Sequence, residues 1–328
     1  MMKPVLCLAT ALAMIAGSQT AGAGVCQNPP AGIAVQCIDP GLTSPHLPTS
    51  PRLNFAMYRR DTQRGAPLFL WMNGTETHQR PGPVGAHVKP LRVAVDHGYR
   101  AISVPYDNQT AIIAICPKNP DPDCSEKVRR HRIYDGPTSI SQRVMALLQY
   151  LDRTEPALHW GDYINGKHPR WKMITVSGQS QGAGMAAFIA KEHPVDRVML
   201  FSSPYDYQMR GDGWVIAPWL GKLSKTPLER WFGGYHLREP GAKKLEVAYR
   251  LLALPEDHIR RFNLDLPPHI QARTTPEKLK RKFHCQGVGN PAYMQDWLAF
   301  LGVKTQEVHG TGQPPDLHQP VDTDDDSG

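Results

Sequence analysis

The stretch that decides the fold is ITVSGQSQG, residues 174–182. It joins an apolar, β-branched run to a segment of small residues, and it contains the pattern G-x-S-x-G at Gly178, Ser180 and Gly182. In this context the pattern predicts a sharp turn from a strand into a helix. The glycines remove Cβ atoms that would collide where the strand and the helix pack closely. We therefore expect Ser180 to occupy a strained turn at the carboxyl end of a strand.

Such a turn would expose the Ser180 hydroxyl above the edge of the sheet. The free N–H groups and the positive dipole end of the following helix point at the same place. The N–H group of Gln181 is therefore predicted to be one donor to a developing oxyanion. The alternative is an ordinary strand–turn–helix joint filled with small residues, which is the weaker interpretation given the flanking patterns.

Strands and helices alternate on both sides of this turn. Apolar or β-branched runs predict strands at 52–58, 67–72, 100–104, 171–176, 197–201, 230–235 and 261–266. Helical spacing and helix-end signals predict helices at 88–97, 139–151, 182–191, 242–254 and 291–301. The segment 107–135 reads as a loop. The alternation predicts an α/β fold with a mainly parallel central sheet flanked by helices.

The sequence also divides into a folded domain and flanking segments that differ from it in composition. We expect a signal peptide at 1–23, an irregular arm at 24–51, the folded domain at 52–304 with a small cap insertion at about 202–227, and a disordered tail at 305–328. The leader has Lys3, then an apolar run too short to span a bilayer, then an A-x-A site. No other apolar segment is long enough to span, so we expect an exported, periplasmic or extracellular protein.

The cysteines agree with an oxidising compartment. One of the six lies in the leader, and the local pairings of the others are Cys26–Cys37 and Cys116–Cys124, with Cys285 left over. Spacing does not fix this connectivity. No pair of cysteines has the spacing of a zinc site, and we expect neither a metal nor an organic cofactor.

The net charge of +7 does not indicate a nucleic-acid partner. The basic residues are scattered except for a short cluster at 278–282, and no nucleic-acid-binding motif accompanies them.

At SGQSQGAG, residues 177–184, the chain resembles the α/β-hydrolase superfamily. It is most similar to a group of predicted secreted bacterial hydrolases whose nucleophile turn reads G-[HQ]-S-Q-G. The resemblance extends over 52–301 and is strongest at the turn. It implies the α/β-hydrolase fold, Ser180 as nucleophile, and catalytic partners in the order Ser, acid, His along the chain. The serine needs an imidazole to take its proton and a carboxylate to orient that imidazole.

The resemblance places the histidine on the loop after the last strand and before the last helix. His284 fits, because it follows the strand predicted at 261–266 and lies in a glycine-bearing segment ahead of the final predicted helix. His309 is the alternative if 305–308 is the last strand, although no helix would then follow it.

The acid is expected after a strand beyond the turn. Glu239 follows the strand predicted at 230–235, although the superfamily more often has an aspartate there. Asp206, after the strand predicted at 197–201, is the alternative, since some members carry the acid one strand earlier. Either carboxylate could instead pair with an arginine.

The second oxyanion donor and the pocket walls are expected from two other segments. The strand predicted at 67–72 opens into Asn-Gly-Thr, and we expect the backbone N–H of Thr75 to be the donor, unless this is an ordinary Asn-Gly turn. In the cap insertion, Trp214 and Trp219 are expected as pocket walls, with core filling as an equal alternative.

Together these residues predict hydrolysis of carboxylic esters through an acyl-enzyme, on a small-molecule or lipid-like substrate. The alternatives are a peptidase or an acyltransferase with the same residues, or a binding protein on a degenerate scaffold. A thiol enzyme using Cys285 is disfavoured because no such turn surrounds that residue.

Overall fold

A central β-sheet organises the described part of the chain. In the computed structural model these residues are 31–76, 81–85, 88–211, 213–304 and 312–313. The strands of the sheet are β1 (Ile33–Ile38), β2 (Arg52–Arg59), β3 (Leu68–Met72), β4 (Gly82–Pro83), β5 (Arg100–Ser103), β8 (Ile174–Gln179), β9 (Val198–Phe201), β12 (Trp231–His236) and β13 (Ile259–Phe262).

The strand order is β1-β2-β5-β3-β8-β9-β12-β13, and β4 pairs with β2 off this path. All neighbours from β5 to β13 are parallel, whereas β1 and β2 are antiparallel to each other and β2 is antiparallel to β5. The carboxyl ends of six parallel strands therefore meet at one edge of the sheet.

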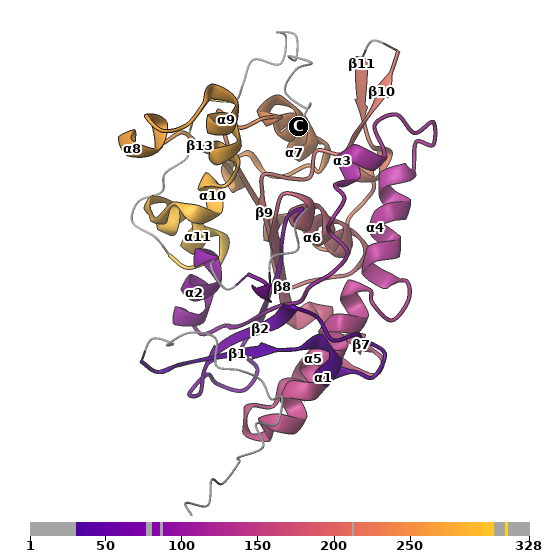
Figure 1. The fold of residues 1–328 in the computed structure, drawn as a ribbon, viewed down its shortest axis with the longest axis vertical. Helices are drawn as coiled ribbons and strands as arrows, with labels where there is room; N and C mark the ends of the chain where they lie inside the picture. Colours follow the sequence, from indigo (N-terminus) through magenta and orange to yellow (C-terminus); the bar gives the residue numbers. More distant parts are fainter. Residues whose placement is uncertain (1–30, 77–80, 86–87, 212, 305–311, 314–328) are drawn as a thin grey trace, which may run out of the picture.

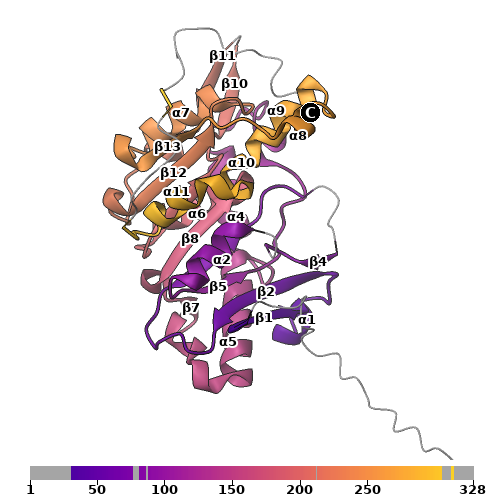
Figure 2. The ribbon, with the colours of Figure 1, turned by 90° about the vertical axis from the view of Figure 1, so that its left-hand side faces the viewer.

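Helices cover the sheet on both faces (Figures 1 and 2). They are α1 (Pro40–Thr43), α2 (Lys89–Asp96), α3 (Ile112–Ile115), α4 (Cys124–Tyr134), α5 (Ile140–Thr154), α6 (Gln181–Glu192), α7 (Ala242–Leu251), α8 (Pro268–Gln271), α9 (Pro276–His284), α10 (Gln286–Gly289) and α11 (Met294–Phe300). Two small hairpins pair β6 (Ile164–Asn165) with β7 (His168–Pro169) and β10 (Tyr207–Arg210) with β11 (Gly213–Ile216).

The core lies in two layers, one on each face of the sheet. Along β3, Leu68, Leu70 and Met72 belong to the layer under α5, α6 and α7, whereas Phe69 and Trp71 belong to the layer under α2 and α11. This period of two follows from the pleat of a strand, and the whole of β3 is apolar because both faces are covered. The predicted fold class, a mainly parallel sheet flanked by helices, is confirmed.

The arm expected to be irregular contains an edge strand. β1 pairs with β2 from Ile33 opposite Arg59 to Ile38 opposite Asn54. Its sequence, IAVQCI, is itself a β-forming run, and it buries Ile33, Cys37 and Ile38. Because the residues around this run are rich in Pro and Gly, the whole arm was expected to be irregular.

The segment 107–135, expected to be a loop, forms α3 and α4. Helix α4 has little apolar periodicity, and the residues it buries include Arg129 and Arg132. Its place in the fold depends on the partners of these arginines, which no local pattern reports.

The segment expected to be a cap insertion, 202–227, contains the β10–β11 hairpin, which projects beyond the sheet in Figure 1. It docks on the loop between α3 and α4: the N–H of Met209 donates to the carbonyl of Pro117 at 2.8 Å, and Arg210 donates to the carbonyl of Pro120 at 3.1 Å. The loop and the hairpin therefore form one structure above the carboxyl ends of the strands.

The loop is closed by the Cys116–Cys124 disulfide, one of the two expected pairings, and Cys285 is free. Cys37 is disulfide-bonded, but Cys26 lies outside the described residues, so their pairing stays a prediction. The signal peptide expected at 1–23 also lies outside them, as does the tail expected at 305–328 apart from 312–313. Among the helices of the described ranges, none is long and apolar enough to cross a membrane.

Candidate active site

The site lies where the connections from two neighbouring strands diverge. β3 lies between β5 and β8, and the chain leaves β3 toward β5 but leaves β8 toward β9. In open α/β sheets, ligands bind in the crevice that opens at such a point, beyond the carboxyl ends of the strands. The residues at its two sides are Thr75, after β3, and Ser180, after β8.

Ser180 occupies the turn between β8 and α6, as predicted. Its backbone has φ 54° and ψ −131°, a region that side-chain-bearing residues rarely adopt. Its N–H donates to the carbonyl of Phe201 at 2.8 Å, which ties the turn to β9. Ser180 is partly exposed, and its hydroxyl makes no hydrogen bond within the described residues.

The two glycines of the turn are required by close backbone contact. A Cβ atom on Gly182 would lie 2.0 Å from the carbonyl oxygen of Met72, and one on Gly178 would lie 2.6 Å from the same atom. The start of α6 therefore packs directly on the end of β3. This contact fixes the distance between the Ser180 turn and the loop that follows β3.

The first helical N–H groups of α6 are available at the turn. The N–H of Gln181 has no hydrogen-bond acceptor among the described residues, as expected for the first turn of a helix. The Gln181 side chain points elsewhere: its Oε1 accepts from the N–H of Ile112 at 2.9 Å and from Arg132 at 3.2 Å. These bonds hold the residue while its N–H stays free for a ligand.

A polar network holds the loop after β3. The carbonyl of Asn73 accepts from Tyr106 at 2.6 Å, the carbonyl of Gly74 accepts from Asn108 at 2.5 Å, and the N–H of Glu76 donates to the carbonyl of Asn108 at 3.1 Å. Within the described part of the chain the N–H of Thr75 donates to no group. The network therefore fixes the backbone on both sides of a free donor, the arrangement that an oxyanion site needs.

His284 lies beside the turn, but on a helix. The structure makes it the last residue of α9, whereas the sequence predicted a loop. Its carbonyl accepts from Gln179 Nε2 at 3.3 Å and lies 3.2 Å from Ser202 Oγ, and Gln179 directly precedes Ser180. The last strand, β13, also ends earlier than predicted, which leaves room for α8 and α9 before the histidine.

Glu239 is the acid that contacts this histidine. Its Oε2 is hydrogen-bonded to Nδ1 of His284, and its Oε1 accepts from the N–H of His236 at 2.8 Å and from Ser202 Oγ at 2.9 Å. The carboxylate is completely buried, and this burial raises the pKa of Glu239, against the opposing effect of His284.

The bond to Glu239 also sets the state of the imidazole. When the carboxyl group is ionised it can only accept a hydrogen bond, so in the neutral imidazole Nδ1 carries the proton and Nε2 has the lone pair. No hydrogen bond joins His284 to Ser180 Oγ in the described residues. In free enzymes such bonds are often long and tighten only when substrate binds.

Asp206, the alternative acid, has a different partner. Its carboxylate binds Arg129 through both oxygens, with Nε to Oδ2 at 2.7 Å, and it accepts from Trp219 Nε1 at 3.0 Å. Both charged side chains are almost fully buried. The structure therefore brings Glu239, and not Asp206, to His284. The alternative histidine, His309, lies outside the described residues.

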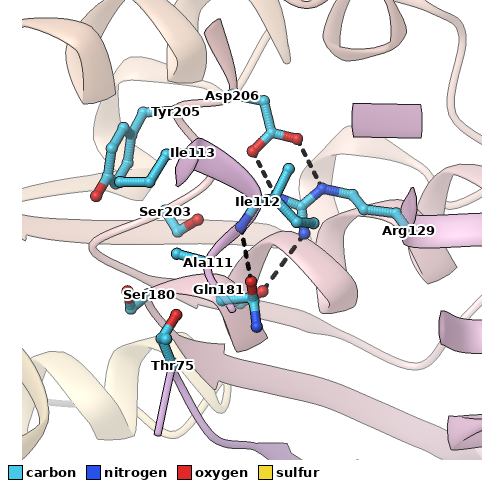
Figure 3. Close-up of a pocket in the computed structure, with 10 residues that line it drawn as sticks. All are labelled: Thr75, Ala111, Ile112, Ile113, Arg129, Ser180, Gln181, Ser203, Tyr205 and Asp206. Carbon is cyan, nitrogen blue, oxygen red and sulfur yellow. Dashed lines mark hydrogen bonds and ion pairs between the residues drawn. The ribbon is translucent and has the colours of Figure 1, made fainter. Parts of the chain in front are cut away.

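A pocket of about 290 Å³, including open solvent at its mouth, adjoins Ser180 (Figure 3). The two tryptophans expected as pocket walls are not among its described lining residues. Trp219 is buried against Phe188 and Arg129 and fills the core, and Trp214 packs on Tyr207 in the hairpin. The lining residues are Thr75, Ala111, Ile112, Ile113, Arg129, Ser180, Gln181, Ser203, Tyr205 and Asp206.

Several residues of the site were missed from the sequence. Ser202 follows β9, the strand next to β8, and the shared edge of parallel strands could have indicated it. Ala111, Ile112 and Ile113 come from the segment read as a loop, and only the tertiary fold brings them to Ser180. No group of three or more metal-ligating side chains is assembled in the described residues.

Comparisons with known proteins find only distant likenesses. No protein-family model matches the chain, and no curated protein matches it. Among solved structures, an α/β hydrolase from a Medee basin deep-sea metagenome library is 13% identical with a TM-score of 0.38, over 82% of this chain and 99% of that one. A bacterial heroin esterase is 14% identical with a TM-score of 0.42, over 84% and 86% of the two chains.

A third solved structure, the acylaminoacyl peptidase of Pyrococcus horikoshii, is 11% identical with a TM-score of 0.41, over 81% of this chain and 41% of that one. Likeness of this degree carries no information about substrate. The fold is established by the strand order and by the turn at Ser180. On these two features, the chain has the α/β-hydrolase fold.

Proposed function

We propose that the protein is a serine hydrolase that cleaves carboxylic esters through an acyl-enzyme. In this proposal Ser180 is the nucleophile, His284 the general base, Glu239 the group that orients the imidazole, and the N–H groups of Gln181 and Thr75 the oxyanion donors. The observation that carries it is the placement of His284, whose Nδ1 is bonded to a buried carboxylate and whose carbonyl is bonded to the residue before Ser180.

The proposed reaction has two halves. Nε2 of His284 takes the proton of the Ser180 hydroxyl as Oγ attacks the ester carbonyl, and the oxyanion forms between Gln181 and Thr75. The tetrahedral intermediate then expels the alcohol, which receives the proton from Nε2. A water molecule, deprotonated by the same nitrogen, releases the acid from Ser180. Each oxyanion donor contributes about 2.7–4 kcal/mol.

Active-site labelling tests the assignment. A fluorophosphonate probe should label Ser180 in the folded protein, and His284→Ala should abolish labelling and ester turnover. His131→Ala is the matched control, because that side chain is 73% exposed and outside the site. Folded protein that does not react, or label mapped to another residue, would contradict the proposal and point to a binding protein on this scaffold.

The same residues could serve a peptidase or an acyltransferase. We expect p-nitrophenyl esters to be hydrolysed and matched p-nitroanilides to be inert. Faster cleavage of the anilides would replace the esterase proposal with a peptidase. Release of alcohol without free acid when a second alcohol is present would indicate an acyltransferase.

We propose further that the protein is exported. The Cys116–Cys124 disulfide supports an oxidising compartment, and residues 1–23 have the pattern of a signal peptide. Cell fractionation with N-terminal sequencing tests this. Full-length protein retained in the cytoplasm would contradict it.

A further inference from the structure

The pocket beside Ser180 lies on one side of the proposed reacting atoms. Both proposed oxyanion donors, Gln181 and Thr75, line it, and His284 is not among its described lining residues. The leaving alcohol must receive its proton from His284, so it must lie on the side of that imidazole. The pocket is therefore positioned for the other half of the ester, the acyl group. This inference rests on the proposed function.

An ion pair lines the end of the pocket that lies away from Ser180 (Figure 3). Figure 3 shows Ser180 and Thr75 at one end of the lining residues and Asp206 with Arg129 at the other. The side chains of Arg129 and Asp206 are 1% and 2% exposed, and Trp219 donates a further bond to Asp206. An acyl chain that pushed this pair apart would leave buried charges uncompensated, which is strongly unfavourable. The ion pair therefore sets the depth of the pocket.

One side wall is fixed as well. Helix α3 supplies Ile112 and Ile113, and the N–H of Ile112 is bonded to the side chain of Gln181 at 2.9 Å. The helix ends at Ile115, and the next residue, Cys116, is bridged to Cys124 at the start of α4. Both ends of this wall are therefore tied to other elements of the fold.

The volume of the pocket then limits its ligand. The volume that is comparable with those of known ligand pockets is about 30 Å³, far below the about 300–1,000 Å³ typical of pockets for drug-sized molecules. Ile112 is buried and its backbone anchors the wall, whereas Ile113 is only partly buried. Shortening Ile113 would therefore enlarge the pocket without emptying the core.

We propose that this pocket is the acyl-binding subsite, that it admits only short acyl groups of about two to four carbons, and that Ile113 limits the chain length. The specificity then lies in the wall supplied by α3 and in the ion pair at the far end, and not in the tryptophans of the cap insertion.

A series of p-nitrophenyl esters from acetate to decanoate tests the proposal. For the wild-type protein, kcat/KM should be highest for acetate to butyrate and at least about tenfold lower for octanoate. Ile113→Ala should raise the ratio of octanoate to butyrate turnover by about tenfold or more, and Ile113→Phe should lower the ratio of butyrate to acetate turnover. Ile115→Ala is the matched control, because Ile115 lies on the same helix, is 38% exposed and does not line the pocket.

Labelling of Ser180 by a small fluorophosphonate distinguishes failure of the acyl-subsite proposal from failure of the proposed hydrolase function. A protein that reacts and turns over esters but prefers octanoate, or whose profile is the same in Ile113→Ala and Ile115→Ala, would overturn the subsite while keeping the hydrolase. Absence of labelling would overturn both. If Ile113→Ala does not fold, Ile113→Val should shift the profile in the same direction, and an unchanged profile would again overturn the subsite.

Discussion

Nδ1 of His284 is hydrogen-bonded to Oε2 of Glu239, although the Glu239 side chain is fully buried and the His284 side chain is 21% exposed. The pair thus connects the interior of the fold to the crevice beside Ser180. One edge of the imidazole is fixed by a carboxylate, and the other edge carries the nitrogen that the proposed chemistry needs.

The two candidate acids should respond differently to loss of charge. Glu239→Gln should lower kcat for a short ester by about 10³–10⁴-fold, because an amide no longer selects the tautomer that leaves Nε2 free. Asp206→Asn should keep more activity than Glu239→Gln. Its main effect should be on stability, with about 3–5 kcal/mol lost from the free energy of unfolding, because Arg129 loses its buried counter-charge. Steady-state kinetics and urea unfolding measure both effects. The reverse order of kcat values would assign the acid to Asp206.

Ser202 should act as a positioning residue for this pair. Its hydroxyl donates to Oε1 of Glu239 at 2.9 Å and lies 3.2 Å from the carbonyl of His284. Ser202→Ala removes the donor and should lower kcat by about 10- to 100-fold at nearly constant KM, the equivalent of about 1–3 kcal/mol. Ser44→Ala, a change at a half-buried position after α1 that does not line the pocket, should leave both constants unchanged. A rise in KM at constant kcat would show that Ser202 acts on substrate binding instead.

The raised pKa of Glu239 predicts a pH dependence of stability. Burial raises this pKa above its ordinary value of 4.5, so the folded state binds the proton more tightly than the unfolded state does. The contribution of Glu239 to the free energy of unfolding should therefore fall as the pH rises from about 4.5 through the raised pKa. The measurement is the difference in unfolding free energy between the wild-type protein and Glu239→Gln at several pH values. A difference that grows in favour of the wild-type protein over this range would contradict the prediction.

Gly182→Ala should be among the most damaging small substitutions in the protein. The new Cβ atom would lie 2.0 Å from the carbonyl oxygen of Met72, and backbone atoms cannot move aside as a flexible side chain can. We expect a loss of about 3 kcal/mol or more from the free energy of unfolding, measured by urea denaturation. Gly221→Ala is the matched control, because no atom lies within 4 Å of its added Cβ atom. Equal stability of the two variants would show that β3 and α6 are further apart than described.

The part of the site that depends on local physics could be predicted from the sequence. Residues 174–182 contain both the apolar strand and the glycines that its contact with the next segment requires, so the turn at Ser180 and the free N–H of Gln181 follow from one short stretch. The alternation of strands and helices predicted the sheet for the same reason, since each element carries its own periodicity.

The parts that depend on tertiary contacts could not be predicted. Helix α4 is held by the pairing of Arg129 with Asp206, a contact between residues 77 positions apart, so its sequence reads as a loop. For α9, only the capping residue Thr275 and Pro276 at the first helical position mark the start of the helix in the sequence. Most of the residues that follow in α9 are polar, so the apolar pattern predicted no helix there and His284 was expected on a loop.

The contact of Gly178 and Gly182 with the carbonyl of Met72 has a consequence for how this protein can change over evolutionary time. The spacing of the two proposed oxyanion donors is set by one main-chain surface resting on another, and not by the fit of side chains in the interior. Substitutions that repack the apolar layers should therefore lower the melting temperature long before they change the spacing of the two proposed oxyanion donors. Lineages that diversify this scaffold are free to vary their interiors and the wall beside α3, while these glycines stay unchanged.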